Sequence, residues 1–447
     1  MNILIAGDSE VAQHLAQVLS VEKHNVSFIC PRQELLKVVE TQSDLMTYHG
    51  DSTSIRLLEE VNPKKKDLLI SVHRDGRLNL LTAILAKKLG VKKCIAKLHD
   101  AEALSPEYKD LCKSLGIDFL VSPEKIASKE IVNLLNNTAA TEIFDFTDKQ
   151  LSLMLVKLEA NAPVVGKSLN EIANLHKHLD FRAVAIHRLS KTIIPKGNDV
   201  FMEGDMAYVI TKPDGIEQLL EMGGKKRFTI NNVMIVGGGT VGAMTSAALE
   251  QNFRITLFDL NYERCQELND LLSNTLVVNG DARDIKLLHD ENIDKMDAFV
   301  AVTNNSETNI LTCLLARKLG VKKTIALVEN LDFIEISRNI GIDTIINKKL
   351  ATASYIIRFT MSAEVVSTKC LTGIEAEVFE FVAKPESPVT KKAIRKLKFP
   401  EKAIIGGIIR EGHGFIAMGD FQIRAGDRVV VFALPQAFHE VDKMFRN

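Results

Sequence analysis

The chain has 447 residues, which at about 100–200 residues per domain is enough for two to four domains. With 56 basic and 57 acidic residues its formal net charge is -1, so the charge balance gives no indication of nucleic-acid binding. Six scattered cysteines without a CxxC pair exclude a disulfide framework or a zinc site of the usual spacing, and they fit a reducing cytosol.

The N-terminus gives no targeting signal. An apolar strand-like run, "NILIAG", begins at Asn2 without a basic region before it or a cleavage site after it. No stretch approaches the roughly 20 apolar residues of a membrane span. We therefore expect a cytoplasmic protein, in which any role at a membrane depends on a partner.

Each half of the chain begins with the rhythm of a doubly wound parallel sheet. Apolar runs rich in β-branched residues alternate with amphipathic helical stretches, because parallel strands need crossover helices. The expected strands of the first half lie in "NILIAG", "NVSFIC", "LMTYHGD", "LLISV", "KCIAKL" and "FLVSP". The pattern predicts a Rossmann-like domain over residues 1–137 and a second one over 232–367.

The two halves are internal repeats. Three separated motifs match at one common offset of 230 residues, which indicates duplication of a whole module. The matching positions are Gly7 and Gly237, Gly50 and Gly280, and Arg77 and Glu307.

The segments after the Rossmann-like domains have a different texture. Residues 182–213 and 402–435 read as short strands joined by glycine and charged turns, which predicts small α+β domains at 138–222 and 368–447. "GDMAYVI" at Gly204 and "GDRVVVF" at Gly426 occupy the same place in each. A linker is expected at 223–231. The predicted class is α/β, with two Rossmann-like domains that are each followed by a small α+β domain.

The second half contains a complete glycine motif, "GGGTVG". Gly237 permits a tight turn, Gly239 leaves room for a pyrophosphate, and Gly242 lets the following helix pack closely on the strand. Asp259 ends the next strand, where a carboxylate can accept both ribose hydroxyls and would repel a 2′-phosphate. NAD(H) is therefore favoured over NADP(H), with ATP and ADP as alternatives.

Further loops of the second half fall at the carboxyl ends of predicted strands, where such sheets bind ligands. The candidate nucleotide-binding residues are Gly237, Gly239, Thr240, Val241, Gly242, Asp259, Asp281, Ala282, Thr303, Asn304 and Asn305.

The first half departs from this motif. Its turn reads "GDSEVA", in which Ser9 and Ala12 replace glycines and Asp8 places a carboxylate near any phosphate. Cys30 stands where Asp259 stands, so the ribose acceptor is missing. Arg32 and Lys97 are candidate phosphate partners, although surface or rim positions explain both as well. The weaker candidate set is Gly7, Ser9, Glu10, Val11, Cys30, Arg32, Asp51 and Lys97.

The tandem order, the motif "GGGTVG" with Asp259, "GDA" at Gly280 and "AVTNNSETN" at Ala301 resemble the TrkA family, the cytosolic subunits of bacterial Trk potassium uptake systems. Each half resembles an RCK (KTN) module followed by a TrkA-C domain. The resemblance implies a homo-oligomeric ring, a dimer or tetramer of the double module. Such a ring would lie beneath a TrkH-type membrane subunit and gate it on binding NAD(H), ATP or ADP. Leu327 and Val328, after "TIA", stand where the resemblance implies a basic residue.

An NAD-dependent oxidoreductase is the main alternative, because it too combines a Rossmann domain with a second domain. Tyr208 and Lys212 have the Y-x-x-x-K spacing of short-chain dehydrogenases, but that pair belongs on a helix and this segment reads as a strand. His187 and His413 do not match one another between the repeats. We expect no catalytic residues and no enzyme activity; a scaffold without ligands is the third alternative.

Two further motifs are weak. "HKH" at 176–178 suggests metal ligands, but residues two apart on a helix face different sides, so exposed histidines and no metal site are expected. "GKS" at 166–168 lacks the earlier glycine of a phosphate-binding loop and is expected to be a turn before a helix. The lysines at 64–66 and the basic run at 225–227 are expected in solvated loops.

Overall fold

The structure is a computed structural model, and it describes residues 1–21, 24–43, 45–99, 105–136, 142–175, 181–188, 191–224, 228–361, 363–371 and 376–446. The chain divides into two compact units. Unit 1 comprises residues 1–126 and 348–362, and unit 2 comprises residues 127–347 and 363–447.

The first half contains a six-stranded sheet in the order β3-β2-β1-β4-β5-β6, with every neighbouring pair parallel. This is the strand order of a doubly wound nucleotide-binding fold. Its strands are β1 (Asn2–Ala6), β2 (Asn25–Cys30), β3 (Met46–His49), β4 (Leu68–Ser71), β5 (Lys93–Lys97) and β6 (Phe119–Val121). Its helices are α1 (Glu10–Val21), α2 (Gln33–Gln42), α3 (Ile55–Glu60), α4 (Gly76–Lys88), α5 (Pro106–Ser114) and α6 (Pro123–Asn136).

The second half repeats this topology, with a parallel sheet in the order β14-β13-β12-β15-β16-β17. Its strands are β12 (Asn232–Val236), β13 (Arg254–Asp259), β14 (Thr275–Asn279), β15 (Ala298–Ala301), β16 (Lys323–Leu327) and β17 (Thr344–Ile346). Its helices are α9 (Thr240–Leu249), α10 (Tyr262–Leu271), α11 (Ile285–Asp290), α12 (Ser306–Lys318), α13 (Asp332–Asn339) and α14 (Lys348–Ile357).

The central strands are buried on both faces, as the near-continuous apolar runs predict for a parallel sheet. Every residue of β4 and of β15 is buried. One basic residue departs from the expectation of a solvated loop. Lys66 is buried, and its ammonium donates to the Ser27 hydroxyl at 2.6 Å, so only its two neighbours Lys64 and Lys65 are exposed. Burial lowers the pKa of Lys66.

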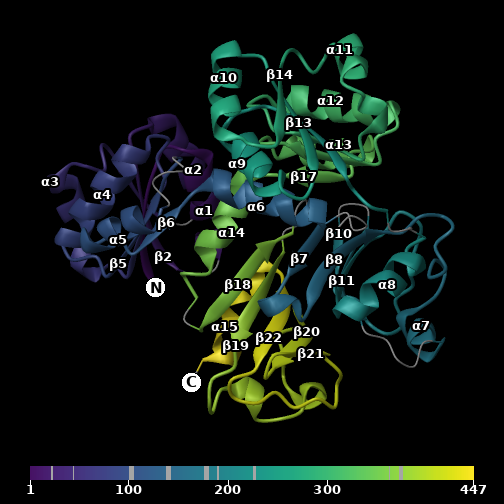
Figure 1. Ribbon diagram of the computed structural model, residues 1–447. Helices are drawn as coiled ribbons and strands as arrows, with labels where there is room; N and C mark the ends of the chain where they lie inside the picture. The colour runs from purple at the N-terminus through teal and green to yellow at the C-terminus, as the bar shows by residue number, and fades with distance from the viewer. Residues whose placement is uncertain are drawn as a thin grey trace. The chain divides into compact units, whose positions relative to one another are not determined.

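The last helix of each Rossmann-like repeat lies wholly (α14) or from Ala127 onward (α6) in the unit that contains the other repeat's sheet. Within unit 1, α14 packs beside α1 (Figure 1), and Lys349 of α14 pairs with Glu10 of α1. Within unit 2, the distal part of α6 joins the core of the second sheet through side chains such as Ile131. Lys323 donates to the carbonyl oxygen of Leu134 at 3.0 Å near the end of α6. The two units therefore do not follow the domain boundaries expected at residues 137 and 367. The division into four domains stays a prediction.

Two five-stranded antiparallel sheets follow the parallel ones, both within unit 2. The first, in the order β10-β9-β11-β8-β7, comprises β7 (Glu142–Asp145), β8 (Ser152–Lys157), β9 (Phe181–Arg188), β10 (Lys191–Ile193) and β11 (Met206–Thr211), with helices α7 (Leu169–Leu175) and α8 (Ile216–Met222). The second, in the order β18-β19-β22-β20-β21, comprises β18 (Val365–Cys370), β19 (Glu377–Val382), β20 (Ala403–Arg410), β21 (His413–Ile416) and β22 (Arg428–Ala433), with helix α15 (Phe438–Phe445).

The small domains also share an ion pair at equivalent positions. Arg188 pairs with the buried Asp205 at 2.7 Å, and Arg410 pairs with the buried Asp427 at 2.7 Å. Each arginine ends a long strand, and each carboxylate also accepts a backbone N–H from the turn before the next strand. The pairs confirm that the small domains are repeats. Together the four sheets confirm the predicted α/β class.

Within the described ranges, no helix has the length and apolar character needed to cross a bilayer.

Candidate functional site

The glycine turn of the second half lies between β12 and α9. Gly237 has a φ of 107°, a conformation that side-chain-bearing residues rarely adopt. A Cβ on Gly242 would lie 1.9 Å from the carbonyl oxygen of Gly237, so only glycine lets α9 begin this close to the strand. A Cβ on Gly239 would meet no atom within 4 Å. There is therefore free space beside the Cα of Gly239, whereas the backbone of Gly237 fills the space beside the Cα of Gly242.

Asp259 ends β13 beside this turn. The backbone N–H of Gly238 donates to its Oδ2 at 2.7 Å, and the N–H of Asn261 donates to its Oδ1 at 2.8 Å. These bonds fix the carboxylate at the carboxyl edge of the sheet. Each oxygen still has a lone pair for a ligand hydroxyl.

The loop after β15 forms the opposite wall. Buried Asn309 accepts from the N–H of Thr303 at 3.0 Å and from its hydroxyl at 2.6 Å, and it donates to the carbonyl oxygen of Leu327 at 2.8 Å. Asn305 caps α12 by accepting from the N–H of Thr308 at 2.6 Å. The first repeat uses Asn79 in the same way, so this asparagine holds the loop in both halves.

A cavity of about 610 Å³ lies between these elements, and we refer to it as the second-half crevice. It brings together most of the predicted second-half residues, whereas Thr240, Val241 and Gly242 do not line it and lie in the first turn of α9. The predicted residues that line it are Gly237, Gly239, Asp259, Asp281, Ala282, Thr303, Asn304 and Asn305.

Sequence reasoning missed two arginines that line the crevice. The Arg264 Nε donates to the carbonyl oxygen of Gly238 at 2.8 Å, which places its guanidinium over the glycine turn. Arg283 binds Asp281 through two nitrogens at 2.7–3.1 Å, and these hydrogen bonds lower the pKa of Asp281. The crevice therefore offers both carboxylates and guanidinium groups at its rim. The "GDAR" motif contained the signal for Arg283, but nothing in the sequence singled out Arg264.

The equivalent turn of the first half is tied down by its own side chains. The Asp8 carboxylate accepts from the backbone N–H of Arg74 at 2.8 Å, across the edge of the sheet. The hydroxyl of Ser9 donates to the carbonyl oxygen of Val72. Both contacts connect the β1–α1 turn to the loop after β4, where the second half has its crevice.

The other first-half candidates have contacts of their own. Cys30 and Val11 are buried, and burial raises the pKa of the Cys30 thiol. Asp51 accepts two hydrogen bonds from Thr53, which lower its pKa. Arg32 is exposed at the start of α2, and Glu10 pairs with Lys349.

Lys97 does not lie at the surface, although a surface or rim position was considered for it from the sequence. It is 4% exposed at the end of β5, and burial lowers its pKa to about 8 although the carboxylates of Glu124 and Asp8 act in the opposite direction. The repeat partner of Lys97 is Leu327, so the second half has an aliphatic side chain at this position.

This burial predicts a pH effect on unit 1. Between pH 8 and 10.5 the unfolded chain keeps the Lys97 proton that the folded chain has lost, so stability rises with pH over this window. Relative to Lys97→Leu, the wild type should gain up to about 3 kcal/mol in free energy of unfolding across it. Urea unfolding of both proteins at several pH values measures this. A constant difference between them would contradict the assignment.

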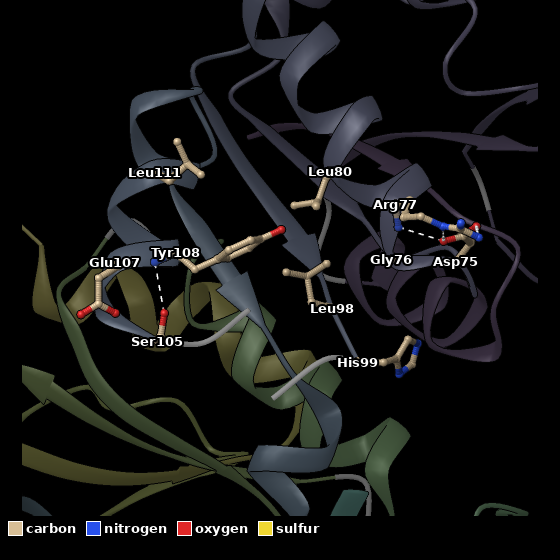
Figure 2. Close-up of a pocket in the computed structure, with 10 residues that line it drawn as sticks. All are labelled: Asp75, Gly76, Arg77, Leu80, Leu98, His99, Ser105, Glu107, Tyr108 and Leu111. Atoms are coloured by element: carbon tan, nitrogen blue, oxygen red, sulfur yellow. Dashed lines mark hydrogen bonds and ion pairs between the residues drawn. The ribbon is translucent and has the colours of Figure 1, made fainter. Parts of the chain in front are cut away.

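A cavity of the first half lies away from these candidates. It measures about 620 Å³ and opens between the N-terminal ends of α4 and α5 (Figure 2). Tyr108 points from α5 toward Leu80 and Leu98, while Asp75 and Arg77 pair at one side. None of the eight first-half candidates lines this cavity.

The motifs of the oxidoreductase alternative are not arranged for catalysis. Tyr208 is buried within strand β11 and Lys212 follows that strand, so the pair has no helical spacing. Ser168 precedes α7, where its N–H and hydroxyl both donate to Glu171 at 2.7 Å, which confirms a turn before a helix. The "HKH" motif at 176–178 and the basic run at 225–227 lie outside the described residues.

Family models match most of the chain. The TrkA-N domain model matches residues 3–123 and 233–348, and the TrkA-C domain model matches residues 153–222 and 378–446. The chain belongs to the TrkA family. The Trk system potassium uptake protein TrkA homolog 1 of Methanosarcina mazei is 30% identical, with 100% of both chains covered. The Trk system potassium uptake protein TrkA of Vibrio alginolyticus is 29% identical, with 100% of this chain and 99% of that protein covered.

These relatives are named as proteins of Trk potassium uptake systems and not as oxidoreductases. The fold of this chain is also similar to solved structures. The GsuK channel matches with a TM-score of 0.60 at 16% identity, covering 100% of this chain and 79% of that chain. The structure of the GsuK channel bound to NAD matches with a TM-score of 0.59 at 16% identity, covering 99% and 78%. At this identity the likeness establishes the fold alone.

Proposed function

We propose that this chain is the regulatory subunit of a Trk-type potassium uptake system, and that an adenine nucleotide in the second-half crevice controls it. The observation that carries the proposal is the crevice itself, which joins an open glycine turn, a fixed carboxylate and the start of a helix. The first turn of a helix offers free N–H groups to phosphates.

Similar folds support a nucleotide as the ligand. A TrkA-N model matches both Rossmann-like repeats, and GsuK structures carry NAD in one case and ADP in another, the latter with a TM-score of 0.51 at 14% identity over 80% of this chain. We propose NAD(H) in preference to ATP or ADP, because Asp259 can accept both ribose hydroxyls. The proposed contacts are the candidate second-half residues together with Arg264, whose guanidinium faces the phosphate end of the turn.

The first half is proposed to bind nucleotide weakly or not at all. Its Asp8 carboxylate already accepts an N–H at the edge where a phosphate would lie, and a second negative charge would be repelled there. The residues Gly7, Ser9, Glu10, Val11, Cys30, Arg32, Asp51 and Lys97 would then have structural roles.

Assembly into a homo-oligomeric ring is supported by exposed apolar side chains that recur at equivalent positions of the repeats. A protein interface would bury these large apolar side chains. The exposed residues are Leu81, Leu111 and Leu115 on and after α4 and α5, and Leu311, Ile336 and Ile340 on and after α12 and α13.

The partner proposed is a TrkH-type membrane subunit, which would bring the protein to the cytoplasmic face of the membrane. Regulation then requires that the nucleotide bind one ring conformation more tightly than another, so that occupancy shifts the ring and the ring moves the pore. By the same linkage, an open pore would raise the affinity for the activating nucleotide.

Calorimetric titration of the full chain with NADH, NAD, ATP and ADP tests the proposal, with Gly239→Ala as the discriminating variant. An added Cβ there meets no protein atom, so the thermal midpoint should stay unchanged. The methyl group would occupy space needed by a phosphate, so the dissociation constant should rise about tenfold. Absence of binding by all four ligands would favour a scaffold without ligands. Unchanged affinity in Gly239→Ala would show that the phosphates do not lie against this turn.

A further inference from the structure

A second large cavity lies within unit 2, beside the sheet of the first small domain. It measures about 820 Å³, and we refer to it as the small-domain cavity. Its walls include Ile172, Phe201 and Leu219 of the first small domain and Ile404 and Phe415 of the second. Protein interiors leave few voids larger than a water molecule, whereas ligand pockets commonly measure about 300–1,000 Å³ and are mostly apolar. The cavity therefore has the size and lining of a ligand site.

The charged residues of this lining all have the same sign. Arg182 and Lys212 line the cavity, and no acidic residue does. The Arg182 guanidinium donates to the carbonyl oxygen of Ala417, and among the described residues no carboxylate pairs with it. Burial lowers the pKa of Arg182 from its ordinary value. Because a partly buried guanidinium is stabilised by a negative partner, Arg182 offers an anion a favourable contact at the cavity wall.

The repeat shows that the fold does not require these cations. Arg182 lies opposite Ile210 in the β9–β11 pair, and Ile404 lies opposite Phe432 in the equivalent β20–β22 pair. The same alignment, with an offset of 222 residues, places Leu434 at the position of Lys212. The second small domain thus forms the same sheet with two aliphatic residues where the first has two cations. Their presence in the first domain calls for a role other than folding.

The cavity has preformed walls. The two small domains share one hydrophobic core, which includes Val184 and Ile210 of the first and Val430 and Phe432 of the second. Thr147 of the first domain also hydrogen bonds to the buried Glu380 of the second. A ligand would therefore enter a site that needs little ordering on binding, which favours affinity.

We propose that the small-domain cavity binds an amphipathic organic anion, a carboxylate with an apolar body, whose head group pairs with Arg182. The planar guanidinium can donate two parallel hydrogen bonds to a carboxylate. The apolar body would lie against side chains such as Phe201 and Leu219. This site is separate from the second-half crevice and does not depend on nucleotide binding.

Titration of the full chain with decanoate tests the proposal, with decan-1-ol as the neutral probe and acetate as the head group alone. We expect saturable binding of decanoate, binding at least about tenfold weaker for decan-1-ol, and none for acetate. Arg182→Ile, which copies Ile404, should weaken decanoate binding about tenfold or more, and Lys212→Leu, which copies Leu434, should weaken it less. Arg182→Lys keeps the charge but loses the second parallel hydrogen bond, so its affinity should lie between those of the wild type and Arg182→Ile.

Lys191→Ile is the matched control, since Lys191 lies exposed on the adjacent strand β10 and does not line the cavity. It should bind decanoate as the wild type does. The thermal midpoint of each variant checks its folding, and Arg182→Ile should fold because the second small domain folds with Ile404. Equal decanoate affinity in wild type and Arg182→Ile would overturn the proposal. So would equal affinity for decanoate and decan-1-ol, or no saturable decanoate binding.

Discussion

Gly242→Ala is expected to lower the free energy of unfolding by about 1–3 kcal/mol and to abolish measurable nucleotide binding. The added Cβ would lie 1.9 Å from the carbonyl oxygen of Gly237, so α9 must move away from β12. The small gain in helix propensity of alanine over glycine, about 1 kcal/mol, does not offset this overlap. Urea unfolding and NADH calorimetry on the same preparation measure both effects.

Gly239→Ala is the control for this prediction, because it adds the same methyl group to the same turn without any overlap. The two variants should therefore lose affinity together, whereas only Gly242→Ala should lose stability. The first repeat carries Ala12 at the position of Gly242, so alanine is compatible with the fold when the turn is built as "GDSEVA". Wild-type stability in Gly242→Ala would show that the helix can retreat without cost.

Asp259→Ala is expected to raise the NADH dissociation constant about 100-fold. The carboxylate would lose two hydrogen bonds to ribose hydroxyls, each worth about 1.5–3 kcal/mol when one partner is charged, of which part is recovered by water. The variant should also discriminate less between NADH and NADPH, because the charge that repels a 2′-phosphate is gone. Calorimetric titration with both dinucleotides measures the two changes.

Cys30→Ala is the matched control for Asp259→Ala, since Cys30 ends β2 at the position that Asp259 occupies on β13. Its NADH affinity should equal that of the wild type if the second half is the nucleotide site. Loss of affinity in Cys30→Ala with no loss in Asp259→Ala would assign the nucleotide to the first half instead.

Periodicity and repetition were sufficient to predict the fold class. The buried strands β4 and β15 read as uninterrupted apolar runs, and the offset between Gly7 and Gly237 identified the duplication. The crevice could also be anticipated, because glycine spacing and the acidic residue at a strand end are local features of the sequence. Short sequence motifs were therefore enough to predict most of the residues that line the second-half crevice.

The features that the sequence did not predict depend on contacts between distant segments. Surface positions were considered for Lys97 and Lys66 because nothing in the local sequence indicates their burial. Their partners come from distant segments: the Glu124 and Asp8 carboxylates act on Lys97, and the Ser27 hydroxyl accepts from Lys66. Arg264 lies on a helix without any motif, and only the fold brings its guanidinium to Gly238. The cation pair of the small-domain cavity likewise appears only when the two small domains are compared in space.

The placement of α6 and α14 bears on how such a protein could have arisen. Each sheet is covered by the closing helix of the other repeat, so neither half of the gene encodes a complete folding unit. A chain with only one repeat would have to exchange this helix with a second copy of itself. With both repeats in one chain, each sheet receives its closing helix from the same molecule, so the folding of each repeat depends on the other.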